Sequence, residues 1–246
     1  MKKVNATATP SPRVAVITGA SGGIGSAIAH TLFSSGYRLV LTSRSKRRLA
    51  EFGTVMGESA KLVSLDITGS GSAERLLATA LDIYGRCDVC VISSGILETG
   101  SIDQIDIDRV AQMARVNVEA SFRIAHVFAR YFAGQNAGHL INISSVLGTK
   151  VIMTAGAYAG TKAAIEFLLE ALRMELAHSD VKITSVRPGL VKTHLHDHWE
   201  TPPEIEFRIP EPLSPDDVAQ AVVFALKQPR HVRIPEVMIL PAGHVI

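Results

Sequence analysis

The residues best suited to chemistry are Tyr158 and Lys162, which lie four positions apart. On a helix, residues at i and i+4 share one face, so a phenol and an ammonium at this spacing interact. A neighbouring positive charge stabilises phenolate over phenol and lowers the pKa of a tyrosine from its usual value of about 10. The spacing therefore predicts a group that moves a proton onto or off a substrate oxygen. Such pairs also arise by chance on solvated helix faces, so the surrounding sequence must decide.

Glycines cluster near the N-terminus in the stretch Thr18-Gly19-Ala20-Ser21-Gly22-Gly23-Ile24-Gly25, which opens into an expected helix. Glycines let the backbone turn tightly and approach a pyrophosphate, and a helix N-terminus offers free amides and partial positive charge to the same group. An ordinary glycine-rich turn would not need a strand before it and a helix after it. This placement predicts a dinucleotide-binding site.

Arg44 stands at the end of the second expected strand, where an NAD-selective site would carry an acidic residue for the ribose hydroxyls. A guanidinium there suits a 2′-phosphate instead. We therefore expect NADP(H) to be preferred, with NAD(H) possible. Lys46, Arg47 and Arg48 follow, and these charges are also consistent with the start of a solvated helix.

Short apolar runs alternate with amphipathic stretches along the chain, a pattern typical of βαβ units and a parallel sheet covered on both faces. Strands are expected at 14–17, 38–41, 61–65, 89–92, 139–143, 182–186 and 236–240, and helices at 24–36, 73–84, 106–134 and 157–177. The fold class is therefore α/β, a doubly wound parallel sheet of about seven strands. Residues 194–215 contain five prolines and no clear period, so we expect a long loop that acts as a substrate lid.

Length and composition favour one domain. The 246 residues are 47% apolar, and 25 basic residues nearly balance 23 acidic ones, so neither nucleic acid nor membrane is an expected partner. Residues 1–12 are expected to be a disordered tail before a catalytic domain at 13–246. The tail has no apolar h-region, no apolar run reaches about 18 residues, and cysteines are few, so we expect a cytoplasmic protein.

The two cysteines, Cys87 and Cys90, are spaced as in a redox pair or half of a zinc site. No second pair completes such a site, and the segment after Asp88 is an expected buried strand, so core packing is favoured. His194, His196 and His198 alternate and could hold a metal. They lie in the irregular segment, so no metal is expected.

Together, the glycine motif, Asn117, Ser145, Tyr158 with Lys162, and Pro188-Gly189 resemble the short-chain dehydrogenase/reductase family in its roughly 250-residue form. The resemblance covers nearly the whole chain. It implies a single-domain Rossmann fold, a nicotinamide cofactor and a catalytic set of four residues. By analogy with the family, a homotetramer or homodimer is also expected.

The resemblance assigns a role to each member of this set. Tyr158 would be the general acid in reduction and the base in oxidation, and Ser145 would bind the substrate carbonyl. Lys162 would tune Tyr158 and bind the nicotinamide ribose, and Asn117 would position a water in the proton relay. Asn is a poor helix former, so its place inside an expected helix requires a reason.

The resemblance also implies cofactor contacts. Asp66 and Ile67 would meet the adenine, and Val191 and Thr193 would meet the carboxamide. The full expected set is Gly19, Ser21, Gly23, Ile24, Gly25, Arg44, Asp66, Ile67, Gly95, Tyr158, Lys162, Pro188, Gly189, Val191 and Thr193. One departure stands out: Ser93-Ser94 replaces the family's usual Asn-Ala before Gly95, which puts the support of the central sheet in doubt.

The expected function is hydride transfer between NADP(H) and a carbonyl or secondary alcohol of a small molecule. A 3-oxoacyl thioester reductase of the fatty-acid type is the alternative within enzymes. A dinucleotide-sensing regulatory protein without catalysis is the alternative outside them. Trp199 and Phe207 would line the substrate pocket or anchor the lid, and spacing does not distinguish these roles or identify the substrate.

Overall fold

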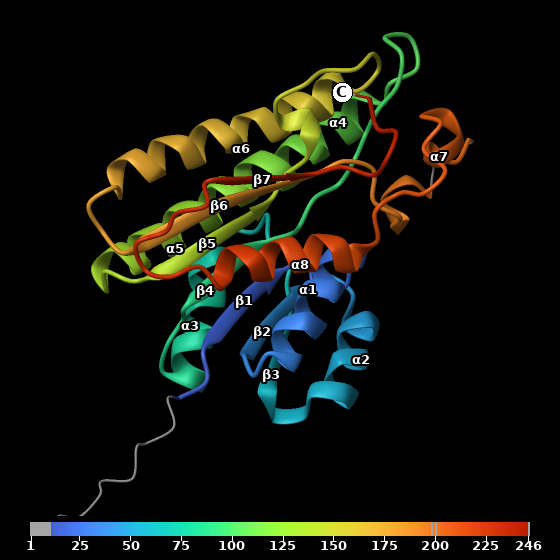
Figure 1. Ribbon diagram of the computed structural model, residues 1–246. Coiled ribbons are helices and arrows are strands. Elements are labelled where there is room, and N and C mark those ends of the chain that lie inside the picture. Colours follow the sequence, from blue (N-terminus) through green and yellow to red (C-terminus); the bar gives the residue numbers. More distant parts are fainter. Residues whose placement is uncertain (1–10, 198, 200, 246) are drawn as a thin grey trace, which may run out of the picture.

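The structure is a computed structural model that describes residues 11–197, 199 and 201–245. Its centre is a sheet in the order β3-β2-β1-β4-β5-β6-β7, in which every neighbouring pair is parallel (Figure 1). The expected seven-stranded doubly wound α/β fold is confirmed. The strands are β1 Val14–Thr18, β2 Arg38–Ser43, β3 Ala60–Ser64, β4 Val89–Ile92, β5 Gly138–Ile143, β6 Val181–Pro188 and β7 Glu236–Ile239.

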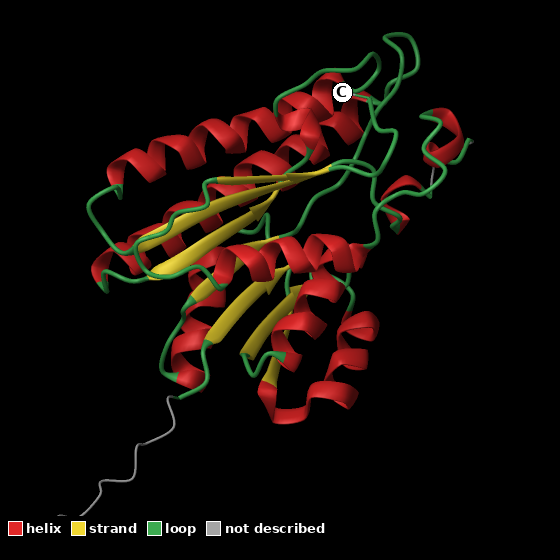
Figure 2. Cartoon of the chain, viewed as in Figure 1, coloured by secondary structure: helices red, strands yellow, loops and turns green. Residues whose placement is uncertain are grey.

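Helices cover both faces of this sheet (Figure 2). α3, α5 and α6 pack on one face, and α1, α2 and α8 pack on the other. The helices are α1 Gly23–Ser34, α2 Lys46–Met56, α3 Ser72–Tyr84, α4 Ile107–Ala114, α5 Ser121–Gly134, α6 Gly156–Glu175, α7 Pro203–Glu206 and α8 Pro215–Leu226. The sequence pattern did not predict bounds for α2, α7 and α8.

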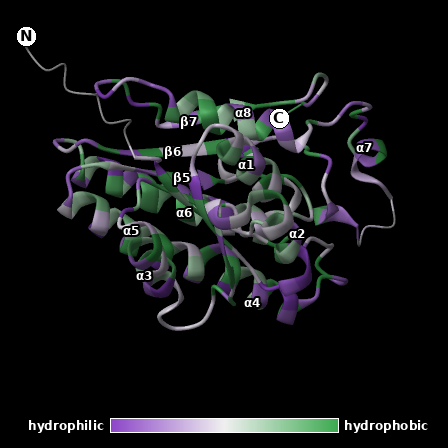
Figure 3. Cartoon of the chain, turned by 90° about the horizontal axis from the view of Figure 1, so that it is seen from below, coloured by the Kyte–Doolittle hydropathy of each residue, from purple (hydrophilic) through white to green (hydrophobic). Residues whose placement is uncertain are grey.

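Two apolar cores result because successive strand residues point to opposite faces of a sheet. In β1, Val14 and Val16 join the core under α3, α5 and α6, whereas Ala15 and Ile17 join the core under α1, α2 and α8. Every residue of β1 is buried, as expected of a central strand covered on both sides. The helix ribbons change between green and purple along their length in Figure 3, which fits helices with one buried and one exposed side.

The strand order reverses between β1 and β4, which are direct neighbours in the sheet. Their connections leave in opposite directions, so a crevice opens beyond the carboxyl ends of these strands. In open α/β sheets this switch point is where ligands bind. The glycine turn after β1 and the Ser93-Ser94 pair after β4 both lie there.

The expected helix 106–134 is one structural unit with a defect in its middle. Residues Arg115–Ala120 form a π-helical segment between α4 and α5, so the chain carries one wide turn at Asn117. Single π turns inside α-helices occur frequently at functional sites. Asp106 caps the N-terminus of α4 by accepting a hydrogen bond from the Arg109 amide, as its residue type predicts.

The segment 194–215 is less irregular than expected. It contains a 3₁₀ turn at His194–His196 and α7, and its last residue begins α8. A capping box between Ser214 and Asp217 starts α8, with Pro215 in the first turn, where its missing N–H costs nothing. The expectation of a continuous loop was therefore wrong, because two local turns form between the prolines.

Cys87 and Cys90 are free thiols with no exposed surface. Burial raises the pKa of Cys87 to about 12, so this thiol stays protonated and unreactive at neutral pH. Core packing is confirmed. Of the expected tail, residues 1–10 lie outside the described part of the chain. Within that part, no helix has both the length and the apolar character needed to cross a membrane.

Candidate active site

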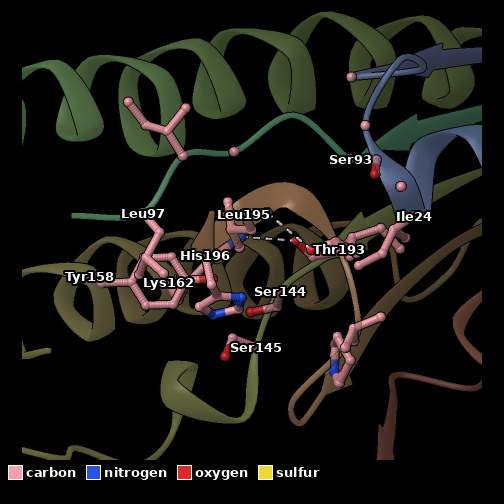
Figure 4. Close-up of a pocket in the computed structure, with 18 of the residues that line it drawn as sticks. Ile24, Ser93, Leu97, Ser144, Ser145, Tyr158, Lys162, Thr193, Leu195 and His196 are labelled. Atoms are coloured by element: carbon pink, nitrogen blue, oxygen red, sulfur yellow. Dashed lines mark hydrogen bonds between the residues drawn. The ribbon is translucent and has the colours of Figure 1, made fainter. Parts of the chain in front are cut away.

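A cavity of about 680 Å³ runs over the carboxyl ends of the strands, from the glycine turn to Tyr158. Its wall includes every residue of the expected catalytic and cofactor-binding sets except Asn117. Figure 4 shows Tyr158, Lys162 and Ser145 along one part of the cavity, and Ile24 and Ser93 along another. The fold therefore brings together residues that are far apart in sequence.

The glycine turn is shaped so that side chains are excluded from it. Gly19 has φ +66°, and a Cβ there would lie 2.8 Å from the carbonyl oxygen of Ser93. A Cβ on Gly25 would lie 2.2 Å from the carbonyl oxygen of Gly19. The backbone is thus bare at the N-terminus of α1, and the amides of its first turn are available to a phosphate group.

Thr18 supports the end of β4. Its hydroxyl oxygen accepts hydrogen bonds from the amides of Ser93 (3.2 Å) and Ser94 (3.3 Å). These bonds use backbone donors, so they do not depend on an Asn side chain at this point of the strand. The doubt raised by Ser93-Ser94 about the central sheet is therefore answered by Thr18, which no spacing argument identified.

Arg44 and Arg48 line the end of the cavity next to β2, and both are exposed. Arg48 lies in the first turn of α2, whereas Arg44 precedes the helix, and Arg48 was missed as a site residue. Ser43 was missed as well. Its hydroxyl is 2.5 Å from the Ser21 hydroxyl and ties the glycine turn to β2. Two cations and two hydroxyls suit a phosphate group.

Asp66 and Ile67 line the cavity after β3. The Asp66 carboxylate accepts hydrogen bonds from the amide (3.0 Å) and the hydroxyl (2.8 Å) of Thr68, which forms an Asx turn. These bonds hold the pKa of Asp66 below its usual value. The turn fixes the orientation of the Asp66 carboxylate just before α3 begins. This geometry is compatible with the expected contact to adenine, which stays a prediction.

Asn117 lies behind the cavity wall rather than on it. Its side-chain amide accepts from the Ile96 amide (2.9 Å) and donates to the Ile96 carbonyl (2.9 Å) and the Thr161 hydroxyl (3.1 Å). The π-helical turn places this buried amide between the loop after β4 and α6. This is the reason for an Asn in mid-helix, and it positions Gly95 and α6 relative to each other.

Tyr158 and Lys162 lie one turn apart on α6, both buried, with the Lys162 nitrogen 5.7 Å from the centre of the Tyr158 ring. The Lys162 ammonium donates to the Ile143 carbonyl at the end of β5 (3.1 Å). Ser145 follows that strand, and its hydroxyl oxygen accepts from the Leu147 amide (3.1 Å). α6 and the end of β5 thus fix the three expected catalytic side chains.

The spacing predicted a lowered pKa for Tyr158, and that direction is wrong. Burial raises the pKa of Tyr158 to about 12, and a hydrogen bond with Ser145 offsets it only in part. Burial also lowers the pKa of Lys162 to about 8, against the attraction of the Glu166 carboxylate. Desolvation is the largest cause of both shifts because both side chains are buried away from water.

Glu166 continues this face of α6 one turn beyond Lys162 and was missed. It accepts from Arg187 of β6 (2.7 Å) and from the Ser185 hydroxyl (2.5 Å). Arg187 in turn donates to Glu236 of β7 (2.6 Å). Burial by itself would raise the pKa of Glu166, but hydrogen bonds from Arg187 and Ser185 outweigh it, and the pKa is lowered. A charged network therefore lies behind Lys162.

Pro188, Gly189, Val191 and Thr193 line the cavity where β6 ends. The Thr193 hydroxyl accepts from the Leu195 amide (3.3 Å) and so caps the 3₁₀ turn at 194–196. His194 and His196 lie in this turn, and the His194 ring is hydrogen-bonded to Asp197 (2.9 Å). Among the residues that the structure describes, no three potential metal ligands come together, and His198 lies outside them.

Comparisons with known proteins agree with this architecture. Residues 13–203 match the family described as short chain dehydrogenase. An uncharacterized oxidoreductase of Staphylococcus epidermidis is 36% identical over 93% of this chain and 97% of its own length. One of Staphylococcus aureus is 34% identical over the same shares.

Solved structures with the same fold include an alcohol dehydrogenase of Thermococcus sibiricus in complex with 5-hydroxy-NADP. It is 29% identical, with a TM-score of 0.83 over 95% of this chain and 98% of that one. Serine dehydrogenase of Escherichia coli is 24% identical, with a TM-score of 0.83 over 95% and 100%. At this lower identity the likeness concerns the fold alone.

Proposed function

The chain belongs to the short chain dehydrogenase family of oxidoreductases, and from that premise we propose that it transfers a hydride between NADP(H) and a carbonyl or secondary alcohol. The observation that carries the proposal is one cavity with the bare glycine turn at one end and Tyr158, Lys162 and Ser145 at the other. The nicotinamide, when bound, supplies or accepts the hydride. NADPH oxidation in the presence of ketones, aldehydes and quinones tests the proposal directly.

In the proposed mechanism Tyr158 moves the proton. Its raised pKa keeps the phenol protonated at neutral pH, which suits proton donation to the oxygen of a carbonyl undergoing reduction. The Ser145 hydroxyl holds that oxygen and stabilises its developing negative charge. The Lys162 ammonium stabilises the phenolate that remains, and the Asn117 amide keeps the loop after β4 in place against α6.

The pH dependence of both directions follows from the two shifted pKa values. We expect kcat/KM for ketone reduction to be flat at neutral pH and to fall as the pH rises through about 8, because Lys162 then loses its proton. Alcohol oxidation should instead become faster with rising pH, since Tyr158 must give up its proton first. Initial rates across this range check both profiles. A reduction rate that increases above pH 8 would contradict the roles given to both residues.

The preference for NADP(H) is proposed to depend on Arg44. The alcohol dehydrogenase of Thermococcus sibiricus, which binds an NADP derivative, supports this choice of cofactor. Changing Arg44 to Ala should weaken NADPH binding roughly 10- to 100-fold, because hydrogen bonds to charged groups contribute about 1.5–3 kcal/mol. NADH binding should change little. Fluorescence titration with both cofactors measures the two affinities.

Arg47 offers a matched control for this titration. It is an exposed arginine in the first turn of α2, three positions after Arg44, and it does not line the cavity, so Arg47→Ala removes an equal charge and should leave both affinities close to those of the parent. Equal affinities of the parent for NADPH and NADH would end the proposed preference. An equal loss of NADPH affinity in the Arg44 and Arg47 variants would show that the cofactor is attracted by positive charge in general and not by a specific contact with Arg44.

Two alternatives make different predictions. A 3-oxoacyl thioester reductase would turn over substrates attached to a carrier protein in preference to free ketones. A dinucleotide-sensing protein would bind NADPH and oxidise none of it over a broad panel of carbonyl compounds. The presence of Ser145, Tyr158 and Lys162 at one cavity favours catalysis over sensing.

We further propose that residues 194–215 act as a lid over the substrate. The base of this segment is closed by pairing of Val191 with Leu213, and Ile209 is buried and anchors it.

A homotetramer or homodimer is proposed as the assembly. The exposed Phe167 and Met174 on α6 provide an apolar face for it, and light scattering measures the oligomeric state. Buried free thiols support a cytoplasmic location as part of the same proposal.

A further inference from the structure

We propose that the substrate carries a bulky apolar group next to its carbonyl, and that this group lies between residues 151–153 and the rings of Trp199 and Phe207. The inference rests on the proposed function, because it concerns the far end of the same cavity. It adds a substrate class, an apolar ketone or aldehyde, that hydride-transfer chemistry alone does not define.

The wall of the cavity around Tyr158 is made of large apolar side chains. Leu97 packs against Tyr158 in one cluster, and Leu147, Leu195 and Trp199 pack against that cluster. The rings of Trp199 and Phe207 meet edge to face, with centres 5.9 Å apart. Both rings line the same cavity as Tyr158, and two aromatic rings packed against each other present a broad apolar surface.

Apolar side chains continue onto the surface at the mouth of the cavity. Val151, Ile152 and Met153 are consecutive and 76%, 39% and 91% exposed, and the first two line the cavity. Three such residues in a row are costly to leave in water, and contiguous exposed apolar patches mark binding sites. Covering them with an apolar ligand recovers about 25 cal/mol for each Å² removed from water.

This loop is held in place from within. The Gly100 amide donates to the Thr154 carbonyl (3.0 Å), which ties it to the segment after β4. Thr154 has φ +66°, a strained conformation for a β-branched residue, and such strain persists where the surroundings fix the backbone. The apolar residues before Thr154 are therefore presented by a defined turn.

Charge supports the same conclusion. Among the described residues that line the cavity, the only carboxylate is Asp66, which follows β3 at the opposite end from Tyr158. An amino-acid substrate would have to bury its ammonium without an anionic partner, which is unfavourable.

A panel of four probes tests the substrate class: acetophenone, acetone and pyruvate with NADPH, and serine with NADP⁺. We expect kcat/KM for acetophenone to exceed that for acetone and pyruvate by at least about 10-fold, because an added apolar group in a fitting pocket gives this factor or more. Serine should not be oxidised measurably. Preference for pyruvate or serine over acetophenone would overturn the inference while leaving the proposed function intact.

A double variant, Val151→Ser with Ile152→Ser, tests the location. It should lower kcat/KM for acetophenone roughly 10-fold, with a smaller change for acetone and an unchanged Kd for NADPH. The matched control is Ile102→Ser, which alters a residue that is 99% exposed and does not line the cavity. An equal loss for both ketones, or the same loss in the control, would contradict the assignment to this loop.

The remaining outcomes separate this inference from the proposed function. If the protein reduces a carrier-bound 3-oxoacyl thioester but not acetophenone, its substrate is the thioester rather than a free apolar ketone, and the inference is overturned. If NADPH binds and no carbonyl compound oxidises it, the proposed function fails, and the inference fails with it.

Discussion

Replacing Tyr158 with Phe should lower kcat by roughly 10²–10⁴-fold, the range in which a positioned general acid or base contributes. The change removes one hydroxyl and leaves the buried ring, so the packing of α6 against Leu97 is retained. NADPH should still bind, because the glycine turn and Arg44 lie at the other end of the cavity. Stopped-flow or steady-state NADPH oxidation, together with a binding titration, measures both quantities.

Tyr84 provides the matched control. Its hydroxyl is hydrogen-bonded to the Leu39 carbonyl (3.3 Å), and it does not line the cavity. Tyr84→Phe removes the same atom and should leave kcat unchanged. Retained turnover in the Tyr158→Phe variant would refute the acid–base assignment. A loss of NADPH binding along with turnover would mean that the ring had moved.

Replacing Arg187 with Met should destabilise the fold by about 3–5 kcal/mol at neutral pH, the usual cost of leaving one partner of a buried ion pair without the other. Arg187 joins Glu166 on α6 to Glu236 on β7, with distances of 2.7 and 2.6 Å. Without the guanidinium, the Glu166 carboxylate stays buried with only hydroxyl donors such as Ser185. Urea unfolding monitored by circular dichroism gives the free-energy difference.

The sign of the pH effect follows from the lowered pKa of Glu166. A carboxyl whose pKa is lower in the folded than in the unfolded chain contributes stability above its unfolded pKa, and this is lost as the pH falls through the folded value. In Arg187→Met, burial would raise that pKa instead. The difference in the free energy of unfolding between the parent and Arg187→Met should therefore become smaller as the pH is lowered and Glu166 becomes protonated.

Two further variants make this prediction specific. Arg123→Met breaks a half-exposed i,i+4 pair with Glu119 and should cost under about 1 kcal/mol. Combining Arg187→Met with Glu166→Gln should restore much of the loss, since the unpaired buried charge is then gone. A cost for Arg187→Met as small as that for Arg123→Met would show that water reaches Glu166 and that the network is not buried in solution.

Much of the architecture was predictable because it depends on short-range patterns. Apolar runs such as 89–92 are long enough for a strand and too short for a helix, and their alternation with helical periods determines a parallel α/β sheet. The glycine turn and the Tyr158–Lys162 pair are likewise local, since their function depends on spacings of a few residues. The boundaries of α2 and α8, and the short helices within 194–215, were not predictable from these patterns, because short or weakly periodic segments follow tertiary packing.

What the sequence determined by itself was the fold class, the family and most of the functional side chains that meet at the cavity, although Ser43 and Arg48 were missed. Only the tertiary structure decided their environment. Asn117 reaches Ile96 across 21 positions, and Arg187 reaches Glu236 across 49, so no spacing rule connects them. The pKa of Tyr158 likewise depends on tertiary structure. The nearby charge of Lys162 predicted a lowered pKa, whereas burial in the folded chain raises it. Desolvation depends on every segment packed around a group, and that packing exists only once the chain has folded.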